Sequence, residues 1–248
     1  MRVLRTGGEF TAMQMWKQRL GIVLGIAGAL AIAAASALFW HPAGALLGLV
    51  PAVAIARPCY RRLVSFQKGA VGEQSVAELL ARLPDSYVLL NDLVLPGHPG
   101  NIDHVLIGPC GVVVIETKRW AGTVACAGDR WSVNGYPRRN VTRQVIGGAI
   151  AAKKCLARGG AGASGWVEAV VVFTHPLCRL VLDRSAPTVA RFSELMNYLT
   201  VRAHPPKLTS YSVGTLAQIL LDGAASGRGN HKGSRRQPVP ASAHQRRT

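Results

Sequence analysis

The pattern of apolar and polar positions separates an apolar N-terminal part from a longer part with regular alternation. Residues 20–40 carry no charge, and a second apolar run covers 43–56 after a His-Pro dipeptide. At 1.5 Å per residue, the first run is long enough for the roughly 30 Å hydrocarbon core of a bilayer. Lysine and arginine lie at the outer ends of both runs, which favours a transmembrane hairpin over 20–56 with both ends in the cytoplasm.

Two features of this apolar part leave alternatives open. The second run is short and contains Pro51, so it is a tilted span, a re-entrant segment or an interfacial segment. A cleaved signal peptide is the alternative for the first run, but a second apolar run follows it at once.

Beyond residue 63 the alternation has the periods of helices and strands. It predicts helices over 68–83, 142–157 and 189–199, and strands over 87–94, 104–107, 112–117, 123–133 and 167–173. This order predicts an α/β or α+β fold with a central mixed sheet. We divide the chain into a short basic segment (1–19), a membrane hairpin (20–56), a main domain (63–200), an extension with a short helix (201–224) and a disordered basic tail (225–248).

Charge and cysteine content narrow the class of protein. The chain has 29 Lys and Arg against 12 Asp and Glu, and most of the excess lies in residues 1–62 and 225–248. A polyanion is therefore an expected partner, and nucleic acid and anionic lipid both fit. The five cysteines are scattered singly, which indicates a reducing compartment and excludes a disulfide framework or a zinc site of closely spaced cysteines.

The stretch NIDHVLIGPCGVVVIETK, residues 101–118, places charge inside a buried hairpin. With the turn at GPCG, the register puts Asp103 opposite Glu116 on one face, and Lys118 points to the same face. Two opposed carboxylates repel unless a cation lies between them, so the pattern favours Mg²⁺ or Mn²⁺. A salt-bridged glutamate and lysine at a strand end is the structural alternative.

A third acid points toward the same core. Glu73 shares the apolar stripe of the helix over 68–83 with Val76 and Leu80, whereas Glu78 lies on the polar face. An acid aimed at the core is what a metal site uses, although a first-turn glutamate favoured by the helix dipole also fits.

These residues resemble a known family. The segments GAVGE (69–73), NDLVL (91–95), NIDH (101–104) and GVVVIETKRWAG (111–122) are similar to the NERD, or nuclease-related, domain. NVTRQ (140–144) and VVVFTHP (170–176) also fit, with Val141 where that family usually has proline. The resemblance covers about residues 65–200 and implies a three-layer α/β/α core like that of restriction endonucleases, of the PD-(D/E)xK type.

The resemblance also implies roles for individual residues. Asp103 and Glu116 are expected to hold the metal, with Glu73 as a further ligand or a water-orienting acid. Lys118 is expected to position or activate the attacking water, and Gln144 to orient substrate or water. His104 alternates to the other face and is interpreted as a packing or supporting residue.

Basic and aromatic residues near this set suggest nucleic acid as the substrate. The candidate contacts are Arg119, Trp120, Arg139 and Arg143, although Trp120 also fits a hydrophobic lid and the arginines a solvated surface. The sequence therefore predicts a multi-pass membrane protein with a cytoplasmic, Mg²⁺- or Mn²⁺-dependent nuclease domain that cleaves DNA. The alternative is a catalytically inactive module of the same fold that binds nucleic acid or a partner protein at the membrane. No oligomeric state is predicted.

Overall fold

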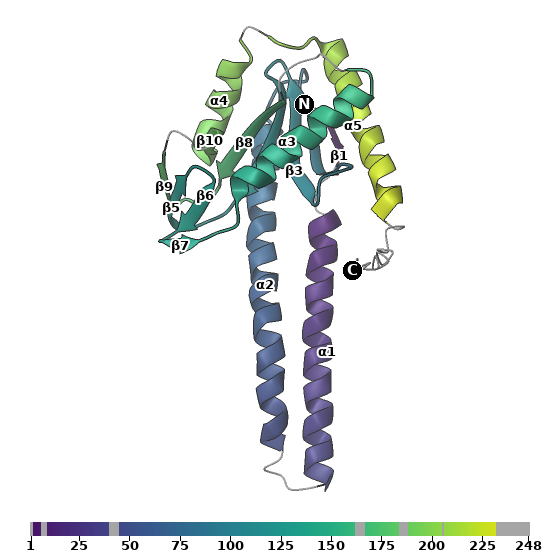
Figure 1. Cartoon of the computed structure of the whole chain (residues 1–248), viewed down its shortest axis with the longest axis vertical. Coiled ribbons are helices and arrows are strands. Elements are labelled where there is room, and N and C mark those ends of the chain that lie inside the picture. The colour runs from purple at the N-terminus through teal and green to yellow at the C-terminus, as the bar shows by residue number, and fades with distance from the viewer. Residues whose placement is uncertain are drawn as a thin grey trace, which may run out of the picture.

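A long pair of helices extends from one end of an α/β body in the computed structural model (Figure 1). The structure describes residues 2–5, 9–39, 45–161, 167–183, 188–204 and 206–231. The pair consists of α1 (Glu9–Phe39) and α2 (Ala45–Leu80), which pack side by side. The C-terminal end of α2 enters the body, so one continuous helix joins the hairpin to the sheet.

The helices of the predicted membrane hairpin are present, but a membrane span is not supported. Within the described residues, no helix has both the length and the apolar character needed to cross a membrane. Both helices continue into charged sequence, because α1 begins at Glu9 rather than Leu20, and α2 runs on past Arg57 to Leu80. The His41-Pro42 turn lies outside the described residues.

The central sheet has six strands and mixed direction. The order is β1-β2-β3-β4-β8-β10, in which β2, β3 and β4 are antiparallel neighbours and the remaining pairs are parallel. The strands are β1 (Arg2–Arg5), β2 (Val88–Val94), β3 (Asn101–Gly108), β4 (Gly111–Lys118), β8 (Val167–Phe173) and β10 (Thr188–Arg191).

Helices cover both faces of this sheet. Helices α3 (Val141–Arg158) and α5 (Ser210–His231) pack on the face that carries Val105 and Val114. The end of α2 and helix α4 (Leu195–Arg202) pack on the face that carries Leu106 and Ile115. Burial on both sides explains why the strand interiors are apolar at consecutive positions, and it confirms the α/β character with a mixed sheet.

A second, four-stranded sheet lies beside the central one, at the left of the body in Figure 1, and we call it the wing. Its order is β7-β6-β5-β9, with β5 (Gly122–Ala127), β6 (Arg130–Val133), β7 (Tyr136–Pro137) and β9 (Cys178–Leu182). The single strand predicted over 123–133 is therefore two strands, joined by a turn in which Gly128 has φ of 65°.

Two other expectations about local structure are wrong. Residues 188–191 form strand β10 rather than the start of a helix, and helix geometry begins only in the 3₁₀ turn Phe192–Glu194. There the Glu194 carboxylate accepts a hydrogen bond from the Arg191 backbone N–H, which fixes the start of the helix. The tail was expected to begin at residue 225, but α5 continues to His231. Residues 232–248 lie outside the described part of the chain.

Candidate active site

The two opposed carboxyls lie at the open end of the β3–β4 hairpin. The observed antiparallel pairs follow the predicted register, with Val105 opposite Val114. A two-residue turn closes the other end, and Gly111 after it has φ of 99°, a conformation that glycine adopts without strain. The pairs end at His104 and Ile115, and beyond them Asp103 contacts β4 through its side chain rather than as a residue paired with Glu116.

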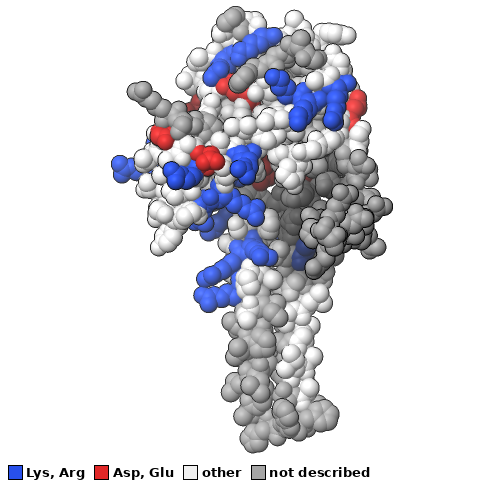
Figure 2. All heavy atoms as spheres, in the orientation of Figure 1, with Lys and Arg blue, Asp and Glu red and all other residues white. Residues whose placement is uncertain are grey.

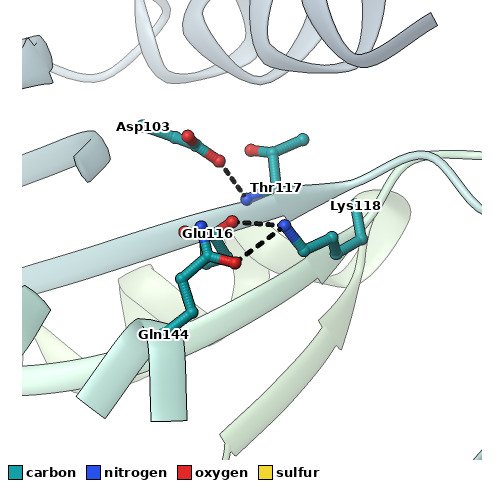
Figure 3. A network of polar contacts seen from close by, with 5 residues as sticks. All are labelled: Asp103, Glu116, Thr117, Lys118 and Gln144. Atoms are coloured by element: carbon teal, nitrogen blue, oxygen red, sulfur yellow. Dashed lines mark hydrogen bonds and ion pairs between the residues drawn. The ribbon is translucent and has the colours of Figure 1, made fainter. Parts of the chain in front are cut away.

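Polar contacts join these acids to their neighbours on β4 and α3 (Figure 3). Asp103 is 7% exposed, and one of its oxygens accepts a 2.8 Å hydrogen bond from the Thr117 backbone N–H. Glu116 is 3% exposed and pairs with the Lys118 ammonium at 2.5 Å. The same ammonium donates to the Gln144 side-chain oxygen at 3.3 Å. The structure therefore brings together four residues that the sequence singled out.

Gln144 reaches this group because α3 begins in the required place. The side chain of Asn140 caps the helix by accepting a 2.8 Å hydrogen bond from the Arg143 backbone N–H. Val141, at the position where the family usually has proline, is 1% exposed and packs in the core. The cap and this buried contact fix the first turn without proline.

Glu73 lies on α2, which packs on the face of the central sheet opposite to α3. The helix lies unusually close to the sheet at Gly72, since a Cβ there would lie 2.9 Å from the Thr174 hydroxyl and 3.4 Å from the Thr117 methyl. Only glycine permits this approach, which brings Glu73 close enough for the charge of Asp103 to influence its pKa. The inward orientation expected from the apolar stripe is therefore observed.

The two glycines before Glu73 give a matched pair of variants. Gly69→Ala meets nothing nearer than 4.0 Å, so it should raise the free energy of unfolding by up to about 1 kcal/mol through helix propensity. In Gly72→Ala the same gain in helix propensity should be outweighed by the contact with Thr174, because the hydroxyl or the helix must move. The free energy of unfolding should therefore fall. Urea unfolding of both variants measures the difference. A Gly72→Ala protein as stable as Gly69→Ala would contradict the close contact.

Burial and mutual repulsion shift the pKa values of the acids upward. Burial, followed by the charge of Asp103, raises the pKa of Glu116 to about 8. Burial, followed by Asp103 and Asp92, raises the pKa of Glu73 to about 7. Burial also raises the pKa of Asp103. Burial alone would lower the pKa of Lys118, but the surrounding carboxylates raise it above its usual value, so its amine stays protonated at neutral pH.

These shifts predict how stability depends on pH. Glu73 and Glu116 hold protons more tightly in the folded chain than in the unfolded one, so folding takes up protons between about pH 4.5 and pH 8. The free energy of unfolding of metal-free protein should therefore fall as pH rises through this range. Urea unfolding in EDTA at pH 5.5 and 8.5 measures the slope. Glu73→Gln/Glu116→Gln should flatten it, whereas a slope unchanged by this pair would assign the dependence to other groups.

The acids are candidate metal ligands because of the chemistry of their carboxylates, and not because the described side chains form a complete coordination site. Among the described residues, no group of three or more His, Cys, Asp or Glu side chains is arranged to hold a metal ion. Carboxylate oxygens are nevertheless the donors that Mg²⁺ and Mn²⁺ prefer. Burial, followed by the charge of Asp103, raises the pKa values of Glu73 and Glu116, and Lys118 lowers them only in part. The residues therefore fit a hard divalent cation that adds the missing positive charge.

His104 and the tryptophans have mainly structural positions. His104 is 2% exposed, contacts the Asn91 side chain at 2.8 Å, and has a pKa lowered to about 3 by burial. Trp131 is buried and donates through its ring N–H to the Thr142 hydroxyl at 2.9 Å. Trp120 packs edge-on against Trp131, with ring centroids 6.5 Å apart, and is only partly buried. The hydrophobic-lid interpretation fits Trp120 better than base stacking.

The arginines predicted to contact nucleic acid lie near the same end of the sheet. Arg119 directly follows Lys118 and is partly exposed, since its Cβ lies against Gly72. Arg139 and Arg143 are exposed on the segment that leads into α3 and on its first turn. The positions of these arginines do not show whether they contact a substrate, so that contact stays a prediction.

The sequence analysis missed three polar residues at the site. Asp92, in the NDLVL segment, is buried at φ of 53° and accepts a 2.9 Å hydrogen bond from the Asn101 side chain. Its negative charge raises the pKa of Glu73. The hydroxyls of Thr117 and Thr174 are buried without a hydrogen-bond partner among the described atoms. The ETK and FTHP segments contain both threonines, but strand alternation alone assigns them no contact.

Comparisons with known proteins match the part of the chain that contains these residues. Residues 68–174 match the profile of the nuclease-related domain, NERD. An uncharacterized protein of Bacillus anthracis is 38% identical over 61 residues, which cover 23% of this chain and 29% of that protein. The match therefore spans less than a third of the relative's length. No solved structure matches the chain, so the restriction-endonuclease-like assignment of the fold stays a prediction.

Proposed function

Residues 68–174 belong to the nuclease-related family, and from that premise we propose that the protein is a divalent-metal-dependent nuclease that hydrolyses phosphodiester bonds of DNA. The observation that carries the proposal is the contact of the Lys118 ammonium with both Glu116 and Gln144, next to the buried Asp103. This set combines acids from two strands, a fixed cation and an amide at one end of the central sheet.

Each residue has a role that follows from its charge and position. Asp103 and Glu116 would hold Mg²⁺ or Mn²⁺, with Glu73 as a further ligand or a water-orienting acid. A bound divalent cation lowers the pKa of its water and offsets phosphate charge. Because the pKa of Lys118 is raised, its ammonium suits stabilisation of the negative transition state better than proton removal. Glu73, with a pKa of about 7, suits acceptance of the proton from the attacking water.

A second candidate is an inactive nuclease-fold module that binds nucleic acid or a partner protein. The 2.5 Å ion pair between Lys118 and Glu116 favours it, because the pair already neutralises one of the proposed metal ligands. Cleavage of labelled DNA with Mn²⁺ separates the two candidates. Cleavage that requires Asp103 supports the nuclease, whereas binding without cleavage supports the module.

Attachment to the cytoplasmic face of the cell membrane is a separate part of the proposal. Its support is the uncharged run over residues 20–40 and the exposure of large apolar side chains on α1, among them Val23 at 60% and Leu30 at 66%. The full chain should remain in the membrane fraction after an alkaline wash, and protease added outside intact cells should spare its C-terminal domain. Release of the chain into the supernatant of the alkaline wash would contradict membrane attachment, and cleavage of the domain by external protease would contradict the cytoplasmic location.

A further inference from the structure

The wing is inserted between the catalytic elements of the site. Strand β5 begins after only three residues beyond Lys118, and β7 leads through Arg138, Arg139 and Asn140 into α3, which carries Gln144. Strand β9 follows Thr174, whose backbone N–H donates to the Lys118 carbonyl at 3.0 Å. These three connections between the wing and the body therefore lie at the active-site end of the central sheet.

Contacts with the body hold the wing in a fixed position. Trp131 of β6 packs against Phe173 of β8, with ring centroids 5.8 Å apart, and Phe173 is paired with Lys118 in the sheet. The turn between β6 and β7 is tied to the start of β5, because the Asn134 side chain accepts a 2.8 Å hydrogen bond from the Thr123 backbone N–H. A side chain on β7 therefore keeps a defined position relative to Lys118.

The outer surface of the wing is basic and carries an exposed aromatic ring. Tyr136 on β7 is 72% exposed. Arg130, Arg138, Arg139 and Arg179 are also exposed. Residues 119–143 and 178–183 together contain six arginines against two aspartates. Figure 2 shows Lys and Arg side chains gathered over the wing and the adjoining upper part of α2.

The two aspartates of the wing already have partners. Asp129 accepts a 2.8 Å hydrogen bond from the Asn140 side chain, and Asp183 accepts from the Gly128 backbone N–H. These contacts pin the wing's turns. The excess of arginine is what the wing presents to a binding partner.

We propose that the wing binds a single-stranded segment of nucleic acid beside the active site, with Tyr136 stacked on a base and Arg138 and Arg139 on neighbouring phosphates. The inference takes its substrate class from the proposed function. A single strand fits better than a duplex, because a flat exposed ring gains contact from a base whose face is free. Arginines beside such a ring supply positive charge that contacts the phosphates of the nucleic-acid backbone.

The geometry also sets the length of strand required. From Lys118 to Thr123 the chain spans at most roughly 17 Å, and Tyr136 lies two strand spacings further, at about 4.8 Å each. A strand of several nucleotides is therefore long enough to join the site and the ring.

The test measures binding of the full chain to a fluorescein-labelled 20-nucleotide oligothymidylate by anisotropy, in EDTA so that no cleavage occurs. Tyr136→Ala should weaken binding about tenfold, and Tyr136→Phe should retain it because the ring remains. Arg138→Gln/Arg139→Gln should weaken binding and lower the slope of log affinity against log salt by about 1.4.

Matched control positions lie on elements outside the wing. Arg158→Gln/Lys207→Gln removes the same charge from exposed positions, and the Lys207 backbone N–H donates to Pro109 at the closed end of the hairpin. Tyr211→Ala removes a tyrosine that is 85% exposed on α5. These variants should bind like the parent. Equal losses from control and wing variants would overturn the inference, because net charge would then explain the affinity.

Two further outcomes separate this inference from the proposed function. Oligonucleotide binding that depends on Tyr136, in a protein that never cleaves, would support the wing and contradict the nuclease. Cleavage by the parent protein, with oligonucleotide binding unchanged in all wing variants, would support the nuclease and contradict the wing inference. If the wing variants lose binding to phosphatidylserine vesicles but not to the oligonucleotide, the surface is a lipid site and the inference is wrong.

Discussion

Replacing Lys118 by methionine is expected to lower the rate of phosphodiester cleavage at least about 100-fold, the usual effect of removing one charge that stabilises a transition state. The ammonium is held by Glu116 at 2.5 Å and by Gln144 at 3.3 Å, so its removal leaves both groups without this cation. Asp103→Ala should have an effect of the same size, because it removes a proposed metal ligand. Initial rates on labelled single- and double-stranded DNA with Mn²⁺ measure both.

Stability measurements show whether these losses are catalytic. Without Lys118, the pKa of Glu116 should rise further from about 8, so the acid is protonated at pH 6 and the fold should lose only about 1 kcal/mol. Asp103→Ala relieves repulsion with Glu116 but leaves the Thr117 N–H without its acceptor, so the two effects oppose each other. A purely structural ion pair predicts the opposite pattern for Lys118, with a clear loss of stability and no activity to lose.

The second large effect is stabilisation by metal. A cation that binds only the folded chain, at a hundred times its dissociation constant, adds about 2.7 kcal/mol to the free energy of unfolding. For a protein of this size that corresponds to a rise of roughly 5–10 °C in melting temperature. The rise should be larger at pH 8 than at pH 6, because metal must displace protons from Glu116 and Glu73, whose pKa values are about 8 and 7.

Thermal melts with Mn²⁺ and with EDTA at the two pH values measure this effect. The Asp103→Ala variant is the control, since it should lose most of the rise. A parent melting temperature indifferent to Mn²⁺ and EDTA would contradict a metal site at these acids and favour the inactive module.

The β3–β4 hairpin could be predicted because its signals are local. Glycines flank a two-residue turn, and a hairpin of that length has one register, so the pairing of Val105 with Val114 followed from counting, whereas the counted pair of Asp103 with Glu116 lies beyond the last paired residues. The orientation of Glu73 followed in the same way from the stripe it shares with Val76. The closeness of α2 to the sheet did not follow, because it depends on which glycine meets Thr117 and Thr174.

Features that depend on distant pairing could not be predicted in this way. Alternation over 123–133 indicates strand but does not say which sheet it joins, and its partner β9 is short and mostly exposed. Strand β10 was taken for helix because Leu195 and Leu199 continue the apolar spacing of a helix from the residues before them. The pairing of Lys118 with Glu116 could be named only as an alternative, because it depends on side-chain conformation, which the sequence pattern does not specify.

The most direct measurement of the central claim is a cleavage time course with the full chain on labelled single-stranded DNA, with the Asp103→Ala protein purified in parallel. The account predicts cleavage with Mn²⁺ that stops on addition of EDTA and is at least about 100-fold slower with Asp103→Ala. Equal cleavage by the parent and Asp103→Ala, or none by the parent with Mn²⁺ or Mg²⁺, would contradict it.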